Sequence, residues 1–209
     1  MRIGIIGSGK IGGTLAKLLA GQGHEVAVSN SRGPESLSGF VAEAGDGVRA
    51  ATIGEAIAFG EVVFVATPMG AYRDLPADRF QGKIVVDANN YYPQRDGHIE
   101  ALDRDETTST ELLAEHLRGA RVLKAFNTMN YRPLGSEGRP GAPRDERLAI
   151  FVAGDDEEAK RILAGLIEEL GFAAVDTGSL AEGGRRQQPG AAVYNNPLPA
   201  PEAEAALSG

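Results

Sequence analysis

A glycine-rich segment near the start of the chain constrains the fold more than any other feature. Residues 7–12 read GSGKIG and directly follow a short apolar stretch at residues 2–6. Apolar side chains then recur every three or four positions from Ile11 to Leu19, which predicts an amphipathic helix. A strand, a GxGxxG turn and a helix in this order are typical of a dinucleotide site. The alternative is a tight strand-to-helix turn without a ligand.

Each glycine of the segment has a separate physical role. Gly7 permits the tight turn, Gly9 lets the backbone approach a pyrophosphate, and Gly12 lets the helix pack on the sheet. The start of the helix adds free N–H groups and the positive end of its dipole. Lys10 either adds positive charge near the phosphates or is an ordinary exposed lysine. We predict that the cofactor contacts the whole segment: Gly7, Ser8, Gly9, Lys10, Ile11 and Gly12.

Composition limits the partners. The chain has 209 residues and a net charge of −8 without a basic block, which disfavours nucleic acid as a partner. It has no cysteine, so disulfides and thiolate chemistry are excluded, and its three histidines lack metal-ligand spacing. Because glycines and a lysine interrupt the apolar start and no long apolar run occurs, we expect neither a signal peptide nor a membrane span. The expected location is cytoplasmic.

Short apolar stretches alternate with helical patterns along most of the chain. Residues 62–66 (VVFVA) and 84–88 (IVVDA) are almost fully apolar, as in strands covered on both faces. This alternation predicts a Rossmann-type, doubly wound α/β fold with a mostly parallel sheet. We expect an NADP-binding Rossmann domain at residues 1–178. Residues 179–209, where prolines cluster, are expected to form a C-terminal arm.

The end of the second predicted strand indicates which nucleotide is bound. An NAD site usually has an acidic residue here that accepts from the ribose hydroxyls. This chain instead reads SNSRG, and its first carboxylate comes at Glu35. A guanidinium and hydroxyls suit a 2′-phosphate, so the sequence favours NADP over NAD. The predicted contacts are Ser29, Asn30, Ser31 and Arg32; the alternative for Arg32 is a solvated loop arginine.

Neutral hydrogen-bonding side chains follow the fourth, fifth and sixth predicted strands. In open α/β sheets, ligands bind beyond these carboxyl ends. No catalytic triad or carboxylate pair accompanies them, which suits hydride transfer, where the cofactor carries the chemistry. Thr67 and Asn127 are the candidates for the hydride-transfer site, although turn chemistry is an equal alternative for the asparagines. The full set of predicted contacts here is Thr67, Pro68, Met69 and Asn89, with Asn90, Asn127, Thr128, Met129 and Asn130 nearby.

Several of these segments resemble one known family. The segments are GSGKIGGTLAKLLA, VSNSRGPESL, VFVATPMGAY, IVVDANNYY, VLKAFNTMNY and GFAAVDTGSLAEGGRRQ. Together they resemble the NADP oxidoreductase, coenzyme F-420-dependent family, over nearly the whole chain to about Gln188. Its members exchange hydride between NADP(H) and the 8-hydroxy-5-deazaflavin coenzyme F-420. One departure is that Asn127 stands where these reductases tend to have histidine.

The resemblance implies roles for the same positions. Ser8, Gly9, Lys10 and Ile11 would lie along the pyrophosphate. Ser29, Ser31 and Arg32 would hold the 2′-phosphate, and Thr67, Pro68 and Met69 would border the nicotinamide. The implied cofactors are NADP(H) and a deazaflavin, and the implied partner is a small-molecule substrate or second redox coenzyme. A homodimer is compatible with an arm that covers a neighbour's crevice.

Three functions remain open at this point. The leading one is NADPH-dependent hydride transfer to a deazaflavin or similar acceptor. The second is reduction of a small carbonyl, imine or flavin, for which Tyr72, Tyr91, Tyr92 or Tyr131 could donate a proton. The third is a non-enzymatic NADP(H)-binding module that contacts a partner through residues 131–145 and the arm.

Overall fold

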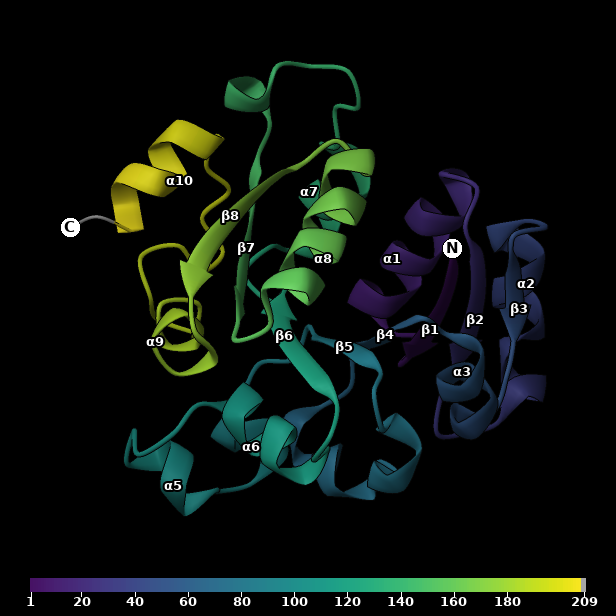
Figure 1. Ribbon diagram of the computed structural model, residues 1–209. Helices are drawn as coiled ribbons and strands as arrows, with labels where there is room; N and C mark the ends of the chain where they lie inside the picture. Colours follow the sequence, from purple (N-terminus) through teal and green to yellow (C-terminus); the bar gives the residue numbers. More distant parts are fainter. Residues whose placement is uncertain (208–209) are drawn as a thin grey trace.

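The computed structural model describes residues 1–207, and within this range eight strands form a single sheet (Figure 1). Their order is β3-β2-β1-β4-β5-β6-β7-β8, and every neighbouring pair is parallel except β6 and β7. The predicted doubly wound, mostly parallel α/β fold is therefore confirmed. The strands are β1 (Arg2–Ile6), β2 (Glu25–Ser29), β3 (Val48–Ala50), β4 (Val62–Val65), β5 (Ile84–Asp87), β6 (Arg121–Ala125), β7 (Ala149–Gly154) and β8 (Ala173–Gly178).

Helices connect the strands and cover the sheet. The α-helices are α1 (Lys10–Gly21), α2 (Ser38–Ala44), α3 (Ile53–Phe59), α4 (Pro93–Asp96), α5 (Glu100–Asp103), α6 (Ser109–His116), α7 (Tyr131–Ser136), α8 (Glu157–Glu169), α9 (Leu180–Arg185) and α10 (Ala200–Leu207). Short 3₁₀ helices are η1 (Pro34–Leu37), η2 (Met69–Asp74), η3 (Ala77–Phe80) and η4 (Arg144–Glu146).

Two apolar cores lie on opposite faces of the sheet. Because side chains alternate along a strand, Ile3 and Ile5 of β1 contribute to one core and Ile6 to the other. Helices α1, α7 and α8 cover the first face, and α3, α6 and α9 cover the second. This arrangement explains why β4 and β5 are buried along their whole length.

The strand order reverses between β1 and β4, which opens a crevice at their carboxyl ends. Ile6 pairs with Val65, and the Ala66 N–H donates to the Ile6 carbonyl at 2.8 Å. The glycine turn after β1 and the chain leaving β4 therefore start from the same edge. In open α/β folds this switch point is where ligands bind.

Two local predictions were wrong. A Thr-Pro pair after a strand predicts an N-cap and the first residue of an α-helix, but Thr67 and Pro68 do not start one. A 3₁₀ helix begins at Met69, and the Thr67 N–H donates to the Asn89 side chain instead. The stretch 131–145 is rich in glycine, proline and charge, which predicts a long surface loop, but it begins with α7. The Asn130 side chain caps this helix and Leu134 is fully buried, so one apolar contact and one cap outweigh the glycine and proline content.

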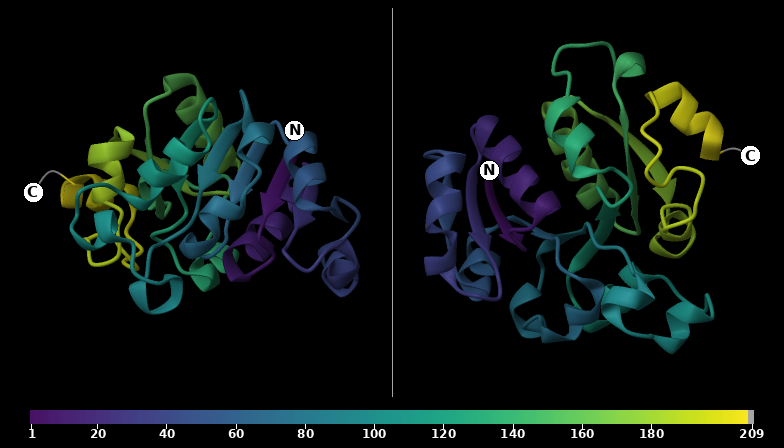
Figure 2. Two further views of the ribbon diagram at one scale, coloured as in Figure 1. Left: turned by 90° about the horizontal axis from the view of Figure 1, so that it is seen from below. Right: turned by 180° about the vertical axis from the view of Figure 1, so that it is seen from behind.

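The segment after β8 packs against the edge of the sheet. Val193 and Ala203 form a small apolar cluster with Phe151 and Val175 of the last two strands. The right view of Figure 2 shows α10, in yellow, at the end of the molecule opposite the N-terminal strands. Among residues 1–207, no helix is both long and apolar enough to cross a membrane.

Candidate functional site

The glycine turn combines tight packing on one side with open space on the other. Gly7 has a φ of +108°, and a Cβ there would lie 2.2 Å from the Ala66 carbonyl oxygen. A Cβ at Gly12 would lie 1.8 Å from the Gly7 carbonyl oxygen. A Cβ at Gly9 would meet no atom within 4 Å, so protein packing does not require this glycine. Close approach of a ligand does explain it.

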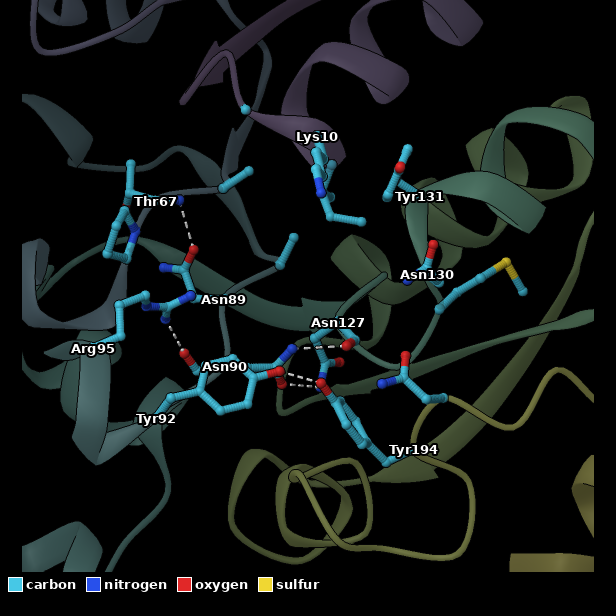
Figure 3. Close-up of a pocket in the computed structure, with 17 residues that line it drawn as sticks. Lys10, Thr67, Asn89, Asn90, Tyr92, Arg95, Asn127, Asn130, Tyr131 and Tyr194 are labelled. Carbon is cyan, nitrogen blue, oxygen red and sulfur yellow. Dashed lines mark hydrogen bonds between the residues drawn. The ribbon is translucent and has the colours of Figure 1, made fainter.

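A cavity of about 430 Å³ opens directly beside this turn (Figure 3). Gly9, Lys10 and Ile11 line one side, and residues that follow β4, β5 and β6 line the floor. Of the predicted contacts, the cavity therefore collects Thr67, Pro68, Asn89 and Asn127 with the glycine turn. Met69, in contrast, is the first residue of η2, is fully buried in the apolar core on the second face of the sheet and is not part of the lining.

Three buried polar atoms at this cavity have no hydrogen-bond partner within the described chain: Thr67 Oγ1, Asn89 Nδ2 and Asn127 Oδ1. Burying such groups without a partner costs about 1–3 kcal/mol each, so most are satisfied in folded proteins. Their clustering in one cavity suits a site for a polar group of a ligand. The three atoms offer it a hydroxyl, an amide N–H donor and a carbonyl acceptor.

The Asn89 amide is held in one orientation. Its Oδ1 accepts from the Thr67 N–H at 2.7 Å, which leaves Nδ2 free for a ligand. Its backbone N–H donates to Asp87 Oδ1 at 3.0 Å, and its carbonyl accepts from Lys124 Nζ at 3.0 Å. These bonds fix both the strand end and the side chain.

Asn127 is fixed just as firmly. Its Nδ2 donates to Asn90 Oδ1 at 3.1 Å and to the Gln187 carbonyl at 2.7 Å, so its Oδ1 is the free atom. The preceding Phe126 has a φ of +65°, a left-handed conformation that bulky residues rarely adopt. This strain costs on the order of 1–3 kcal/mol, and it turns the chain so that Asn127 enters the cavity.

A buried ion pair lies under the cavity floor. Lys124 and Asp87 are 1% and 0% exposed and pair with each other at the carboxyl ends of the neighbouring strands β6 and β5. Lys124 Nζ also donates to Thr110 Oγ1 at 2.9 Å, and that hydroxyl donates to Asp87 Oδ2 at 2.5 Å. The sequence prediction missed this network, although the charged residues within the apolar segments IVVDA and VLKAF were a visible signal.

Tyrosines line the outer part of the cavity. The Tyr92 and Tyr194 hydroxyls are hydrogen-bonded to each other, and burial and this bond raise the pKa of Tyr194 to about 12. The Lys10 ammonium lies 5.0 Å from the centre of the Tyr131 ring. Tyr194 was missed because it lies in the predicted arm, 102 positions from Tyr92.

The other two tyrosines considered as proton donors lie elsewhere. Tyr72 is 5% exposed within the apolar core on the second face of the sheet. The Tyr91 hydroxyl donates to Asp103 Oδ1 at 2.6 Å and accepts from the Ile99 N–H. The cavity therefore selects Tyr92 and Tyr131 from the predicted set.

The residues after β2, predicted to contact the cofactor, lie at a second cavity. Ser29 is fully buried and its hydroxyl donates to the Ile5 carbonyl at 3.2 Å. Asn30 Oδ1 accepts from the Arg32 N–H at 2.9 Å, which shapes the turn. Asn30 and Ser31 line a second cavity, of about 500 Å³, whereas the Arg32 side chain is exposed. The Ser8 hydroxyl accepts from Asn30 Nδ2 at 3.3 Å and links this turn to the glycine turn.

Comparison with known proteins assigns the family. Residues 2–91, which hold the glycine turn and the segment after β2, match the family described as NADP oxidoreductase coenzyme F420-dependent. The structure is similar to hypothetical protein SMa0349 of Sinorhizobium meliloti, with 34% identity, a TM-score of 0.82 and 95% of each chain covered. Residues 2–91 of the chain belong to the coenzyme F420-dependent NADP oxidoreductase family.

Two other similar proteins carry the names of reductases. A protein of Arthrobacter sp. FB24, assigned as an F420-dependent NADP-reductase, has 28% identity and a TM-score of 0.73, with 86% of each chain covered. Metalloreductase STEAP3 of Rattus norvegicus is 32% identical over 182 residues. That match covers 86% of this chain but only 34% of the metalloreductase, so the chain spans about a third of this relative's length.

The residues fit the dinucleotide that this family uses. The open space at Gly9, the packed glycines on either side and the unpaired polar atoms beyond it form one continuous crevice. The glycine turn suits the pyrophosphate, and the unpaired amides suit the carboxamide of a nicotinamide. In the described part of the chain, no group of three or more His, Cys, Asp or Glu side chains is placed to hold a metal ion.

Proposed function

We propose that this protein is an NADPH-dependent oxidoreductase that transfers hydride directly between NADP(H) and a second small molecule in the 430 Å³ cavity. The cluster of unpaired atoms on Thr67, Asn89 and Asn127 carries this proposal. These atoms lie next to the glycine turn, where the reactive ring of a bound dinucleotide would need to be oriented.

The protein's own groups bind the dinucleotide and orient its carboxamide. Gly9 and Lys10 hold the pyrophosphate through backbone N–H groups and charge. The Asn89 Nδ2 donor and the Asn127 Oδ1 acceptor fix the orientation of the carboxamide, with Thr67 Oγ1 as a further partner. When bound, NADPH supplies the hydride. The strained Phe126 and the buried Lys124 keep the two amides in place before the cofactor arrives.

The acceptor proposed first is the deazaflavin coenzyme F-420. The family description and the Arthrobacter structure support it. The test mixes the protein, NADPH and oxidised F-420 and follows the absorbance of both coenzymes. Transfer of deuterium from one face of 4-deuterated NADPH to the deazaflavin is the expected result. Turnover of NADPH with other acceptors but not with F-420 would contradict this choice of acceptor.

A second candidate reaction is reduction of a small carbonyl, imine or flavin. The phenols of Tyr92 and Tyr194 favour it, because they place a pair of hydrogen-bonded hydroxyls inside the same cavity. Tyr92→Phe tests this candidate: loss of turnover with a carbonyl or imine panel supports it, and unchanged turnover contradicts it. Tight NADPH binding without turnover across all acceptors would instead indicate a non-enzymatic NADP(H)-binding module.

NADP is preferred over NAD in this proposal because of the turn after β2. Arg32→Ala is expected to weaken NADPH binding far more than NADH binding, since the guanidinium contacts only the 2′-phosphate. Isothermal titration with both nucleotides measures the difference. An equal loss for both would contradict the predicted role of Arg32.

A further inference from the structure

The 500 Å³ cavity is separate from the cavity that holds the unpaired amides, and the two share no lining residue. Asn30, Ser31 and Gly33 form one rim, and the start of α3 forms another. The chain between β4 and β5 closes it with Asp74, Pro76 and Arg79. Arg79 is the cation among these lining residues, and the sequence analysis did not single it out.

Arg79 reaches this cavity because its own short helix is anchored. The next residue, Phe80, is fully buried in the apolar core, which fixes η3 on the second face of the sheet. From there the guanidinium lies against Gly54 in the first turn of α3: a Cβ at Gly54 would be 2.1 Å from Arg79 Nη1. Gly54 has no positive φ, so its lack of a side chain makes room for the guanidinium.

No hydrogen bond or ion pair joins the Arg79 side chain to another residue in the described part of the chain. Asp74, the carboxylate in the same lining, is not paired with it. A planar guanidinium with five unused donors matches the oxygens of a phosphate, which it can bind through two parallel hydrogen bonds. An unpaired cation at the edge of a nucleotide cavity therefore indicates an anionic group of the ligand.

The position of Arg79 relative to Arg32 indicates which anionic group of the ligand it binds. Arg32 lies between Ser31 and Gly33, which line the rim opposite the Arg79 segment. Among residues 1–207, the Arg32 side chain also has no hydrogen bond or ion pair; only its backbone N–H is bonded. We propose that Arg79 is a specificity-determining residue that binds the 2′-phosphate of NADPH together with Arg32. Asp74 is left to accept a hydrogen bond from the ribose or the adenine. This inference rests on the proposed function, because it assumes that NADPH occupies the crevice.

The test compares Arg79→Gln with the wild type, and Arg118→Gln serves as the control because Arg118 is an exposed arginine bonded to Glu115. Isothermal titration uses NADPH, NADH, adenosine 2′,5′-bisphosphate and AMP. A hydrogen bond to a charged group is worth about 1.5–3 kcal/mol, so Arg79→Gln should weaken NADPH and the bisphosphate about 10- to 100-fold. NADH and AMP should change less than about twofold, since they lack the phosphate.

Gly54→Ala gives an independent check that leaves Arg79 in the sequence. The added methyl displaces the flexible guanidinium rather than backbone, so the fold is retained. It should weaken NADPH binding as Arg79→Gln does, and the two changes together should not add, because both remove the same contact.

Three results would overturn the inference. Equal losses for NADPH and NADH would mean that Arg79 contacts the adenine instead, and unchanged NADPH binding would mean that it contacts no ligand. Additive losses in the double variant would mean that Gly54 and Arg79 affect NADPH binding independently, so that the two changes do not remove the same contact. If the wild-type protein binds no NADPH, the proposed function fails as a whole. If the wild type prefers NADPH and Arg79→Gln does not alter this preference, only the role of Arg79 fails.

Discussion

Replacing Gly9 with alanine separates the requirements of the fold from those of the ligand. Gly9 has φ −72° and ψ −166°, which alanine adopts readily, and its Cβ would meet no protein atom within 4 Å. Alanine has fewer accessible backbone conformations than glycine in the unfolded chain, and this difference stabilises the folded protein by about 0.4–1 kcal/mol. Alanine is a poorer N-cap than glycine, which offsets part of this gain. We therefore expect the free energy of unfolding to change by less than about 0.5 kcal/mol.

The same methyl would occupy the space where the pyrophosphate approaches. We expect NADPH to bind at least about tenfold more weakly, a loss of about 1.4 kcal/mol. Thermal unfolding with and without NADPH measures this directly. A concentration of 100 times the wild-type Kd stabilises the wild type by about 2.7 kcal/mol, and a tenfold weaker variant by only about 1.4 kcal/mol.

Two other glycines of the same helix are matched controls. Gly21 also has no atom within 4 Å of an added Cβ, but it lies at the far end of α1, so Gly21→Ala should leave NADPH binding unchanged. Gly12→Ala would push a methyl into the Gly7 carbonyl and should destabilise the fold by about 1–3 kcal/mol or more. Wild-type NADPH affinity in a folded Gly9→Ala protein would refute the assignment of this turn to the pyrophosphate.

Three further predictions concern stability and ionisation. Lys124→Met should destabilise the protein by about 3–5 kcal/mol in urea unfolding, because Asp87 would be left as a buried, unpaired charge; a smaller loss would contradict the role of this pair. Tyr194→Phe should abolish the phenol that ionises near pH 12 in ultraviolet difference titration; its persistence would assign that ionisation to another tyrosine. The Arg121 hydrogen bond holds the pKa of Asp156 at about 2, below its ordinary 3.8, so the stability that this carboxylate contributes is present above pH 3.8 and is lost as the pH falls through 2. The difference in denaturation midpoint between the wild type and Asp156→Asn should accordingly shrink over that range; a constant difference would contradict it.

Local patterns predicted most of the elements. The apolar run at residues 62–65 forms β4. Thr108 and Glu111 have the spacing of a capping box, and they form one at the start of α6. Such local patterns could not predict that β7 is antiparallel to β6, because strand direction depends on how the chain returns across the sheet. Residues 208–209 of the predicted arm lie outside the described residues.

The sequence likewise predicted some residues of the candidate site but not the contacts between them. The sequence named the glycine turn, Thr67, Asn89 and Asn127, because each follows directly from a strand end. It could not show that the Asn89 and Asn127 amides each have one polar atom left unpaired, since their partners come from other strands and from Gln187. Tyr194 and Arg79 were missed for the same reason.

The sequence by itself determined the alternation of strands and helices, the glycine turn after β1 and the absence of an acid directly after β2. These features depend on neighbours within a few residues, where chain geometry sets what is possible. Only the tertiary structure decided which polar atoms remain unpaired, which tyrosine faces Tyr92, and that Arg79 borders the second cavity beside Gly54. These are contacts between distant segments, and burial of both faces of the sheet brings them together.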